Sequence, residues 1–216
     1  MSTSASSATG PITARGRRTR DAILDAAAEL FLRLGVHATS VEDILEASGT
    51  GKGQLYHYFG SKEGLVRAVL RDRADRYFET HAPLLDDLDS WDGLGRWFDA
   101  ILRAHDRPGC HGCLFGMLAS ELADHDPELR AELDRFFDRW RGHLARGLAA
   151  MRSSGLLRPE ADPEALSLLA LAAAQGGFLL AKASDDVRPA RLALDQVLSY
   201  FKSLSPASSC PTLGPG

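Results

Sequence analysis

Hydrophobic residues recur every three or four positions along most of the chain, which is the spacing of one face of an α-helix. The first stripe stops before Gly35, a residue that commonly ends helices, and consists of Ile23, Leu24, Ala27, Leu30, Phe31 and Leu34. We find no convincing alternation of polar and apolar residues of the kind that predicts a half-buried strand. The pattern therefore predicts an all-α protein of about nine helices.

Local signals mark where the later helices begin and end. Ser40 followed by Asp43 is a capping-box signature and starts a short second helix that ends near Gly49. A third short segment follows at about residues 52–58, and Ser61 caps a long fourth helix. Prolines and glycines separate the remaining stripes, which lie at about residues 91–105, 113–123, 127–152, 163–183 and 189–204.

Both ends of the chain carry few residues that a core could bury. Residues 1–16 and 205–216 are rich in Ser, Ala, Thr, Gly and Pro, so we expect both to be disordered. The N-terminal stretch has no apolar run of the kind found in secretory signals, which favours a cytoplasmic protein. The longest uncharged run, residues 165–181, contains Ser, Gln and two glycines, and we interpret it as a buried helix rather than a membrane span.

The net charge of −4 is divided unevenly along the chain. Residues 1–62 carry seven Lys and Arg against six Asp and Glu, whereas residues 63–216 carry 18 against 23. Arg15, Arg17, Arg18 and Arg20 crowd just before the first apolar stripe. A basic N-terminal part in an acidic protein points to a local anionic partner rather than to a uniformly basic protein.

The stretch GTGKGQLYHYFGSK, residues 49–62, allows two readings, a phosphate-binding loop or the reading helix of a helix-turn-helix. A Walker-type loop needs Ser or Thr after Gly-Lys and a buried strand before it. Gly53 follows Lys52, and a predicted helix precedes the stretch, so the phosphate-loop reading fails. A short helix, a glycine turn and a second short helix over about residues 40–59 instead predict a helix-turn-helix.

The segment TRDAILDAAAELFLRLGVHATSVEDILEASGTGKGQLYHYFGSKEGLVRAVL resembles the N-terminal domain of the TetR family of transcriptional regulators, over about residues 17–77. The resemblance implies a DNA-binding domain at 17–77 and a ligand-binding and dimerisation domain at 78–204. It also implies a homodimeric repressor that binds a palindromic operator in double-stranded DNA and is released by a small effector. The candidate DNA-contacting residues are Arg17, Arg18, Thr39, Ser40, Thr50, Lys52, Gln54, Tyr56, His57, Tyr58 and Lys62.

These residues have different expected roles. Lys52 and Lys62 are point charges suited to phosphates, and the arginines before the first helix either grip the backbone or minor groove or remain solvated. Gln54 stands where small residues are common in the family, and its amide can pair with one adenine edge. Phe59 is expected in the core.

The C-terminal segment GCLFGMLASELADHDPELRAELDRFFDRW resembles the branch of the family that responds to multidrugs and flavonoids. We expect a dimer interface on the apolar helix at 163–183 and on a last helix that presents Val197, Leu198, Phe201 and Leu204. An effector pocket between helices is expected to accept apolar and aromatic molecules, with His105 or His111 as further polar contacts. Its candidate lining is Trp97, Phe98, Phe115, Met117, Phe137, Trp140, Gln175 and Phe178.

Cys110 and Cys113, three apart near a predicted helix start, leave a rival reading open, a thiol-based redox switch on the same scaffold. A structural zinc site would need a second ligand pair at similar spacing, and only scattered histidines are present. We expect no metal and no cofactor. The chain has neither a glycine-flanked nucleophile elbow nor a paired-histidine metal motif, so enzymatic activity is not expected.

Overall fold

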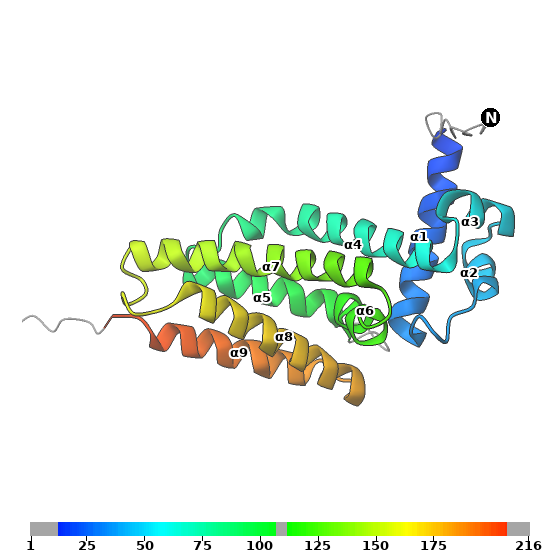
Figure 1. Ribbon diagram of the computed structural model, residues 1–216. Coiled ribbons are helices and arrows are strands. Elements are labelled where there is room, and N and C mark those ends of the chain that lie inside the picture. The colour runs from blue at the N-terminus through cyan, green and yellow to red at the C-terminus, as the bar shows by residue number, and fades with distance from the viewer. Residues whose placement is uncertain (1–12, 107–111, 207–216) are drawn as a thin grey trace, which may run out of the picture. The chain divides into compact units, whose positions relative to one another are not determined.

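The computed structural model describes residues 13–106 and 112–206, and within these ranges it contains nine α-helices and no strand. The all-α prediction is therefore confirmed. The chain divides after Asp72 into two compact units, whereas the sequence predicted a boundary at residue 77. The helices are α1 (Ala14–Leu34), α2 (Val41–Ser48), α3 (Lys52–Phe59), α4 (Lys62–Leu85), α5 (Trp91–His105), α6 (Leu114–Leu122), α7 (Pro127–Ser153), α8 (Pro163–Ser184) and α9 (Arg188–Ser203) (Figure 1).

Helix α1 begins earlier than the sequence predicted. Thr13 is its N-cap, because the Thr13 hydroxyl oxygen accepts a hydrogen bond from the Gly16 backbone N–H at 3.1 Å. The expected disordered arm at 1–16 is therefore too long at its C-terminal end, and Arg15 belongs to the first turn of the helix. The rest of the expected arm, residues 1–12, and residues 207–216 of the expected tail lie outside the described residues.

The first unit is built on a small apolar core and a tight turn between α2 and α3. Ile23, Phe31, Ile44 and Leu55 are fully buried and come from α1, α2 and α3. Gly49 ends α2 in the left-handed region at φ +63°, a conformation that glycine adopts without a Cβ penalty. The sharp turn and the shared core fix α3 against α2 in the order of a helix-turn-helix.

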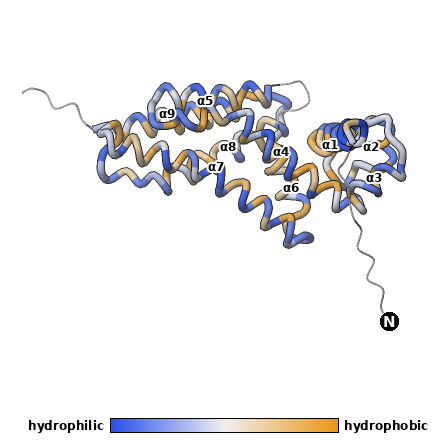
Figure 2. The backbone as a smooth tube through the Cα atoms, turned by 90° about the horizontal axis from the view of Figure 1, so that it is seen from above, coloured by the Kyte–Doolittle hydropathy of each residue, from blue (hydrophilic) through white to orange (hydrophobic). Residues whose placement is uncertain are grey.

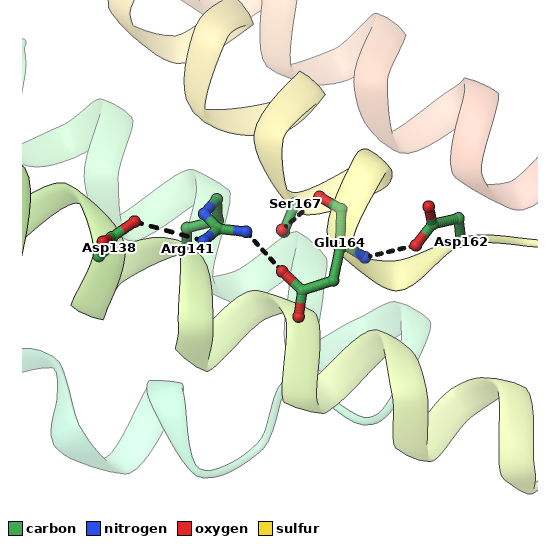
Figure 3. A network of polar contacts seen from close by, with 5 residues as sticks. All are labelled: Asp138, Arg141, Asp162, Glu164 and Ser167. Atoms are coloured by element: carbon green, nitrogen blue, oxygen red, sulfur yellow. Dashed lines mark hydrogen bonds and ion pairs between the residues drawn. The ribbon is translucent and has the colours of Figure 1, made fainter.

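Within the second unit, α8 packs against both α7 and α9. A Cβ on Gly177 of α8 would lie 2.7 Å from the Cα of Ala190 in α9, so the close approach of these two helices requires glycine there. Arg141 of α7 pairs with Asp138 on its own helix and with Glu164 at the start of α8 (Figure 3). The close contact at Gly177 joins α8 to α9, and the ion pair of Arg141 with Glu164 joins α8 to α7.

The face of α8 that points away from α7 and α9 remains apolar and exposed. Leu168, Leu169, Leu179 and Leu180 are 42 to 69 % exposed and recur at helical spacing. Among the described helices, α8 alone is long and apolar enough to cross a membrane, and 39 % of its most apolar 18-residue window is buried. Colouring by hydropathy shows the helices of the chain mixing polar and apolar residues (Figure 2).

Three of the four residues that the sequence assigned to an interface near the C-terminus are buried within the chain, and the fourth, Leu198, is partly exposed. Val197, Phe201 and Leu204 are at most 6 % exposed and belong to the core of their own unit. The apolar stripe of α9 covers α8 from within the chain, whereas the exposed side of α9 carries Leu192 and Tyr200. The prediction was wrong for Val197, Phe201 and Leu204, because a stripe that covers a core and one that covers a partner have the same helical spacing, and an interface on the exposed side of α9 stays a prediction.

Candidate nucleic-acid interface

Helix α3 exposes most of its side chains. Leu55 alone among its residues is buried, and it anchors the helix to the core of the first unit. Tyr58 and Phe59 are partly exposed, and the remaining residues, Lys52, Gly53, Gln54, Tyr56 and His57, are exposed. Such a short helix, fixed by one apolar anchor and otherwise open, can enter a major groove about 12 Å wide.

An ion pair joins the two helices of the motif. Lys52 Nζ lies 3.1 Å from Glu42 Oε1, and both side chains are more than half exposed. The hydrogen bond from Lys52 lowers the pKa of the Glu42 carboxyl, and the same bond raises the pKa of the Lys52 ammonium. Lys52 is therefore charged and steered toward α2, and a phosphate must compete with Glu42 for it.

Gln54 has a structural role in addition to its expected one. The Gly51 backbone N–H donates to Gln54 Oε1 at 3.0 Å, which satisfies one of the free donors at the start of α3. Bidentate pairing with adenine requires both the oxygen and the nitrogen of the amide. Gln54 Oε1 has a second lone pair for the adenine amino group, so the bond from Gly51 orients the amide without using all of its acceptor capacity, and the assignment to adenine stays a prediction.

Lys62 is also engaged within the domain. Its Nζ donates to the Val36 carbonyl oxygen at 2.6 Å, which ties the start of α4 to the loop after α1. An ammonium has three protons, so two donors remain for a phosphate. The lysine is therefore both a tether between two segments and a candidate phosphate contact.

The polar residues before and after α2 divide into buried and exposed. Thr39 is wholly buried, and its hydroxyl donates to the Gly35 carbonyl at 2.7 Å. Burial removes Thr39 from the DNA-contacting set, which corrects the prediction for this residue. Ser40 is exposed and caps α2, with its hydroxyl donating to Asp43 Oδ2 at 2.7 Å. The Thr50 hydroxyl lies 2.7 Å from that of Ser48.

Basic and aromatic side chains complete the exposed surface of the first unit. Arg17 and Arg18 are exposed near the start of α1. The rings of His57 and Tyr58 pack edge to face with centroids 5.1 Å apart, which restrains both side chains. Phe59 is only partly buried, contrary to its expected place in the core, and the guanidinium of Arg20 lies 5.9 Å from its ring centroid.

A second candidate site, for a small molecule, lies between α6 and α8 in the second unit. The pocket has a volume of about 460 Å³, which is within the range of ligand sites. Met117, Gln175 and Phe178 from the predicted lining are part of it. The full lining is Gly112, Cys113, Gly116, Met117, Ser120, Glu121, Gln175, Gly176, Phe178, Leu179 and Lys182.

The other predicted lining residues lie elsewhere. Trp97, Phe98, Phe115 and Trp140 are at most 8 % exposed, are not among the residues that line the pocket, and pack within the core of the unit. Phe137 is partly exposed and packs edge to face on Phe136. His105, on α5, stacks on Phe178 with ring centroids 4.1 Å apart. His111 lies outside the described residues.

Apart from Gln175, sequence reasoning missed the polar and glycine residues of this pocket, and it also missed Leu179. Lys182 and Glu121 carry no motif, although they follow Gln175 and Met117 at helical spacing on α8 and α6. Gly116 admits Gln175, because a Cβ at Gly116 would lie 2.5 Å from Gln175 Oε1. The periodicity of α6 and α8 was visible in the sequence, whereas their proximity was not.

The structure gives little support to the redox switch that the spacing of Cys110 and Cys113 suggested. Cys113 is a free thiol at the N-cap of α6, and burial raises its pKa. Reactive cysteines instead have a lowered pKa, so the raised pKa of Cys113 weighs against a redox role even though the residue is partly exposed. Cys110 lies outside the described residues. Within residues 13–106 and 112–206, no group of three or more His, Cys, Asp or Glu side chains is placed to hold a metal ion.

Comparisons with known proteins match both units. Residues 23–69 match the family model described as bacterial regulatory proteins of the tetR family, and residues 92–197 match the tetracyclin repressor-like C-terminal domain. An uncharacterised HTH-type regulator from Lactococcus lactis is 31 % identical over 87 % of this chain and 95 % of its own length. The repressor KstR2 from Rhodococcus jostii is 34 % identical over 69 % of this chain and 72 % of its own length.

Two further similarities concern the branch and the three-dimensional structure. The uncharacterised regulator YxaF from Bacillus subtilis is 29 % identical over 86 % of this chain and 96 % of its own length, which supports the narrower branch only loosely. The crystal structure of E. coli NemR in its reduced form is 26 % identical, covers 83 % of this chain and 94 % of its own, and has a TM-score of 0.74. The helix-turn-helix, the C-terminal domain and these relatives agree, and the chain belongs to the TetR family, as a non-enzymatic, DNA-binding transcriptional regulator.

Proposed function

We propose that the protein is a homodimeric repressor that acts in the cytoplasm, binds a palindromic operator through α3 and is released by an effector bound between α6 and α8. The open face of α3 carries this proposal. Lys52, Gln54, Tyr56 and His57 are exposed on a helix held by the buried Leu55. These side chains supply one phosphate-binding cation, one amide and two aromatic or imidazole groups for base edges.

Base reading by α3 is tested by titrating operator variants with Gln54→Ala at several salt concentrations. Loss of a base contact should weaken binding to the best operator by about 1–3 kcal/mol per half-site and relax preference at one base pair. Loss of Gly51 capping alone would weaken binding to every sequence equally. Equal weakening on all operators would show that Gln54 serves only as a cap.

The exposed leucine face of α8 supports dimerisation. Leu168, Leu169 and Leu180, which are 42 to 59 % exposed and do not line the pocket, form a patch that a second copy would remove from water. A two-fold dimer would use the same patch on both subunits and present two α3 helices to two half-sites. Residues 63–216 carry more Asp and Glu than Lys and Arg, but this excess does not cause repulsion at the proposed contact, because residues 165–181 carry no charge.

Leu180→Glu tests this interface with little risk to the fold, because Leu180 is 59 % exposed in one chain. A carboxylate in a dimer seam would be buried without a partner and should shift the protein to monomer. Leu156→Glu, in the exposed segment before α8, is the matched control and should leave the dimer intact. Sedimentation velocity distinguishes the two states, and a dimeric Leu180→Glu protein with unchanged melting would exclude this face as the interface.

Release by the effector is the second part of the proposal. The supporting observation is the pocket of about 460 Å³ with Met117, Leu179 and Phe178 among its lining residues. The redox alternative lacks comparable support, because burial raises the pKa of the Cys113 thiol. Measuring DNA release by small apolar molecules, with and without peroxide followed by dithiothreitol, separates the two mechanisms.

A further inference from the structure

The side-chain amide of Gln175 belongs to the lining of the pocket between α6 and α8, and its hydrogen bond there is a weak one. Gln175 Nε2 donates to Cys113 Sγ at 3.7 Å, and both residues line the pocket. Burial raises the pKa of the Cys113 thiol, so the sulfur keeps its proton at neutral pH. Because a thiol sulfur is a weak acceptor, an oxygen or nitrogen acceptor that enters the pocket would compete well for the Nε2 donor.

The oxygen of the same amide lies against a glycine of the facing helix. A Cβ built on Gly116 of α6 would lie 2.5 Å from Gln175 Oε1, so the oxygen occupies space that is open because residue 116 is glycine. Among the residues that the structure describes, no group donates a hydrogen bond to Gln175 Oε1. Gln175 is partly exposed, and the acceptor capacity of its oxygen is therefore open to a bound molecule.

A donor and an acceptor on one amide select a ligand that carries the complementary pair. The N–H and C=O of a glutamine side chain lie on one edge, which is how glutamine pairs with an adenine base through two hydrogen bonds. A lactam holds its own N–H and C=O on the same side of the ring. It can therefore donate to Gln175 Oε1 and accept from Gln175 Nε2 at the same time.

The rest of the lining favours an uncharged and mainly apolar ligand. Glu121 and Lys182 are the two charged residues among those that line the pocket, and their charges are opposite. Each of them already interacts with other groups of the protein. Met117, Phe178 and Leu179 add apolar residues to a pocket of about 460 Å³, a volume that suits a small ligand.

We propose that this pocket binds a neutral, mainly apolar molecule with a lactam-type amide edge, which pairs with the side-chain amide of Gln175 and replaces its bond to Cys113. This ligand class rests on the proposed function, because it specifies the effector of the repressor. A charged ligand that displaces the present partners of Glu121 or Lys182 is the rival outcome of the test.

The test uses bicyclic probes of similar size that differ in their polar edge. The lactam 3,4-dihydroquinolin-2-one has both N–H and C=O, its N-methyl derivative and 2-tetralone have the acceptor alone, and 1,2,3,4-tetrahydroquinoline has the donor alone. The charged probes are 2-naphthoate and protonated 1,2,3,4-tetrahydroisoquinoline. Calorimetry on the full-length protein should show the lactam binding about tenfold more tightly than every other probe. Tightest binding of a charged probe, or equal binding of the lactam and a probe with a single polar function, would overturn the proposal.

A first pair of variants tests the amide itself. Gln175→Leu removes both hydrogen-bonding groups and should lower the affinity of the lactam to that of 2-tetralone. Gln196→Leu is the same change on an exposed residue of α9 outside the pocket lining, and it should keep the tenfold preference. Persistence of the preference in Gln175→Leu would overturn the assignment of the contact.

A second pair of variants moves the amide without removing it. Gly116→Ala places a Cβ where Gln175 Oε1 lies, and the amide must shift because it is at the end of a flexible side chain. The preference for the lactam should then fall as it does in Gln175→Leu. Gly176→Ala, also in the lining, adds a Cβ in open space and should keep the preference. An unchanged preference in Gly116→Ala would contradict pairing with the amide in this position.

DNA binding measured on the same samples separates this proposal from the proposed function. If the protein binds its operator and none of the probes binds at millimolar concentration, the ligand class is wrong and the repressor function stands. If the lactam binds through Gln175 but no operator is bound, the repressor function is wrong and the pocket assignment stands. Binding of the lactam that also releases DNA supports both.

Discussion

Tyr77 on α4 offers a sharp test of how the second unit is held together. The indole N–H of Trp140 in α7 donates to the Tyr77 hydroxyl oxygen at 2.8 Å. Tyr77→Phe would remove the acceptor of Trp140 while keeping the ring, which stacks on His81 and contacts Phe136 edge to face.

The expected loss follows from the burial of the donor. Trp140 is 5 % exposed, and a buried donor left without its partner costs about 1–3 kcal/mol. Removing the hydroxyl also removes a polar group from the interior, so we expect the lower part of this range, about 1–2 kcal/mol. For a protein of this size, that loss corresponds to a fall in melting temperature of about 2–8 °C.

Calorimetric or circular-dichroism melting measures this change directly. Tyr200→Phe is the matched control, because Tyr200 is 49 % exposed and should change stability by less than about 0.5 kcal/mol. Equal melting of the wild type and the Tyr77→Phe variant would refute the inference that this hydrogen bond supports the fold.

The pH dependence of the same variant is a second readout. Burial raises the pKa of the Tyr77 hydroxyl, so the unfolded chain ionises at Tyr77 at a lower pH than the folded one. The stability from the neutral phenol is present below about pH 10 and is lost as pH rises further. The wild type should therefore lose more stability than Tyr77→Phe above pH 10, and parallel losses would contradict the raised pKa.

Three further predictions concern the DNA-binding unit and the thiol of Cys113. Glu42→Gln should free Lys52 and tighten binding to all DNA sequences, most strongly at low salt. Glu46→Gln, on the same helix, is the control and should tighten binding less in titrations at several salt concentrations. Equal effects of the two variants would show that the ion pair has no special role. Lys62→Met removes the bond to the Val36 carbonyl and one phosphate-binding charge, so it should lower the melting temperature and flatten the salt dependence of DNA binding by about one phosphate per subunit. A flatter salt dependence without a change in melting would show that the bond to Val36 adds no stability. Iodoacetamide should label Cys113 much more slowly in the folded protein than in urea, as mass spectrometry of its peptide would show, and equal rates would mean that the thiol is reactive.

The sequence predicted the helices well because their signals are local. Ser40 and Asp43 form the capping box that their spacing indicated, and Gly49 adopts the left-handed conformation that ends α2. The start of α1 was missed because Thr13 caps a helix whose first turns carry arginines in place of an apolar stripe. The spacing of Thr13 and Gly16 could have indicated this start, because a Thr hydroxyl at an N-cap accepts from the backbone N–H three residues later.

The less accurate predictions depend on contacts between distant segments. Thr39 precedes α2 like a surface residue, yet its hydroxyl is satisfied by Gly35 inside the core. The stripe of α9 that contains Phe201 covers its own chain, and only the packing of α8 on α9 reveals this. The pairing of Gln175 with Cys113 joins residues 62 positions apart. Helical periodicity says which residues share a face and leaves open what that face meets.

The central claim, that two copies of α3 read a palindromic operator, is tested most directly by footprinting the purified protein on the DNA upstream of its own gene. The account predicts two protected half-sites related by a two-fold axis, with centres about one helical turn or a multiple of it apart. It also predicts that Leu180→Glu, which disrupts the proposed dimer face, loses this paired protection at concentrations that saturate Leu156→Glu. A single protected site with no symmetry, or paired protection that persists in a monomeric Leu180→Glu protein, would contradict the claim.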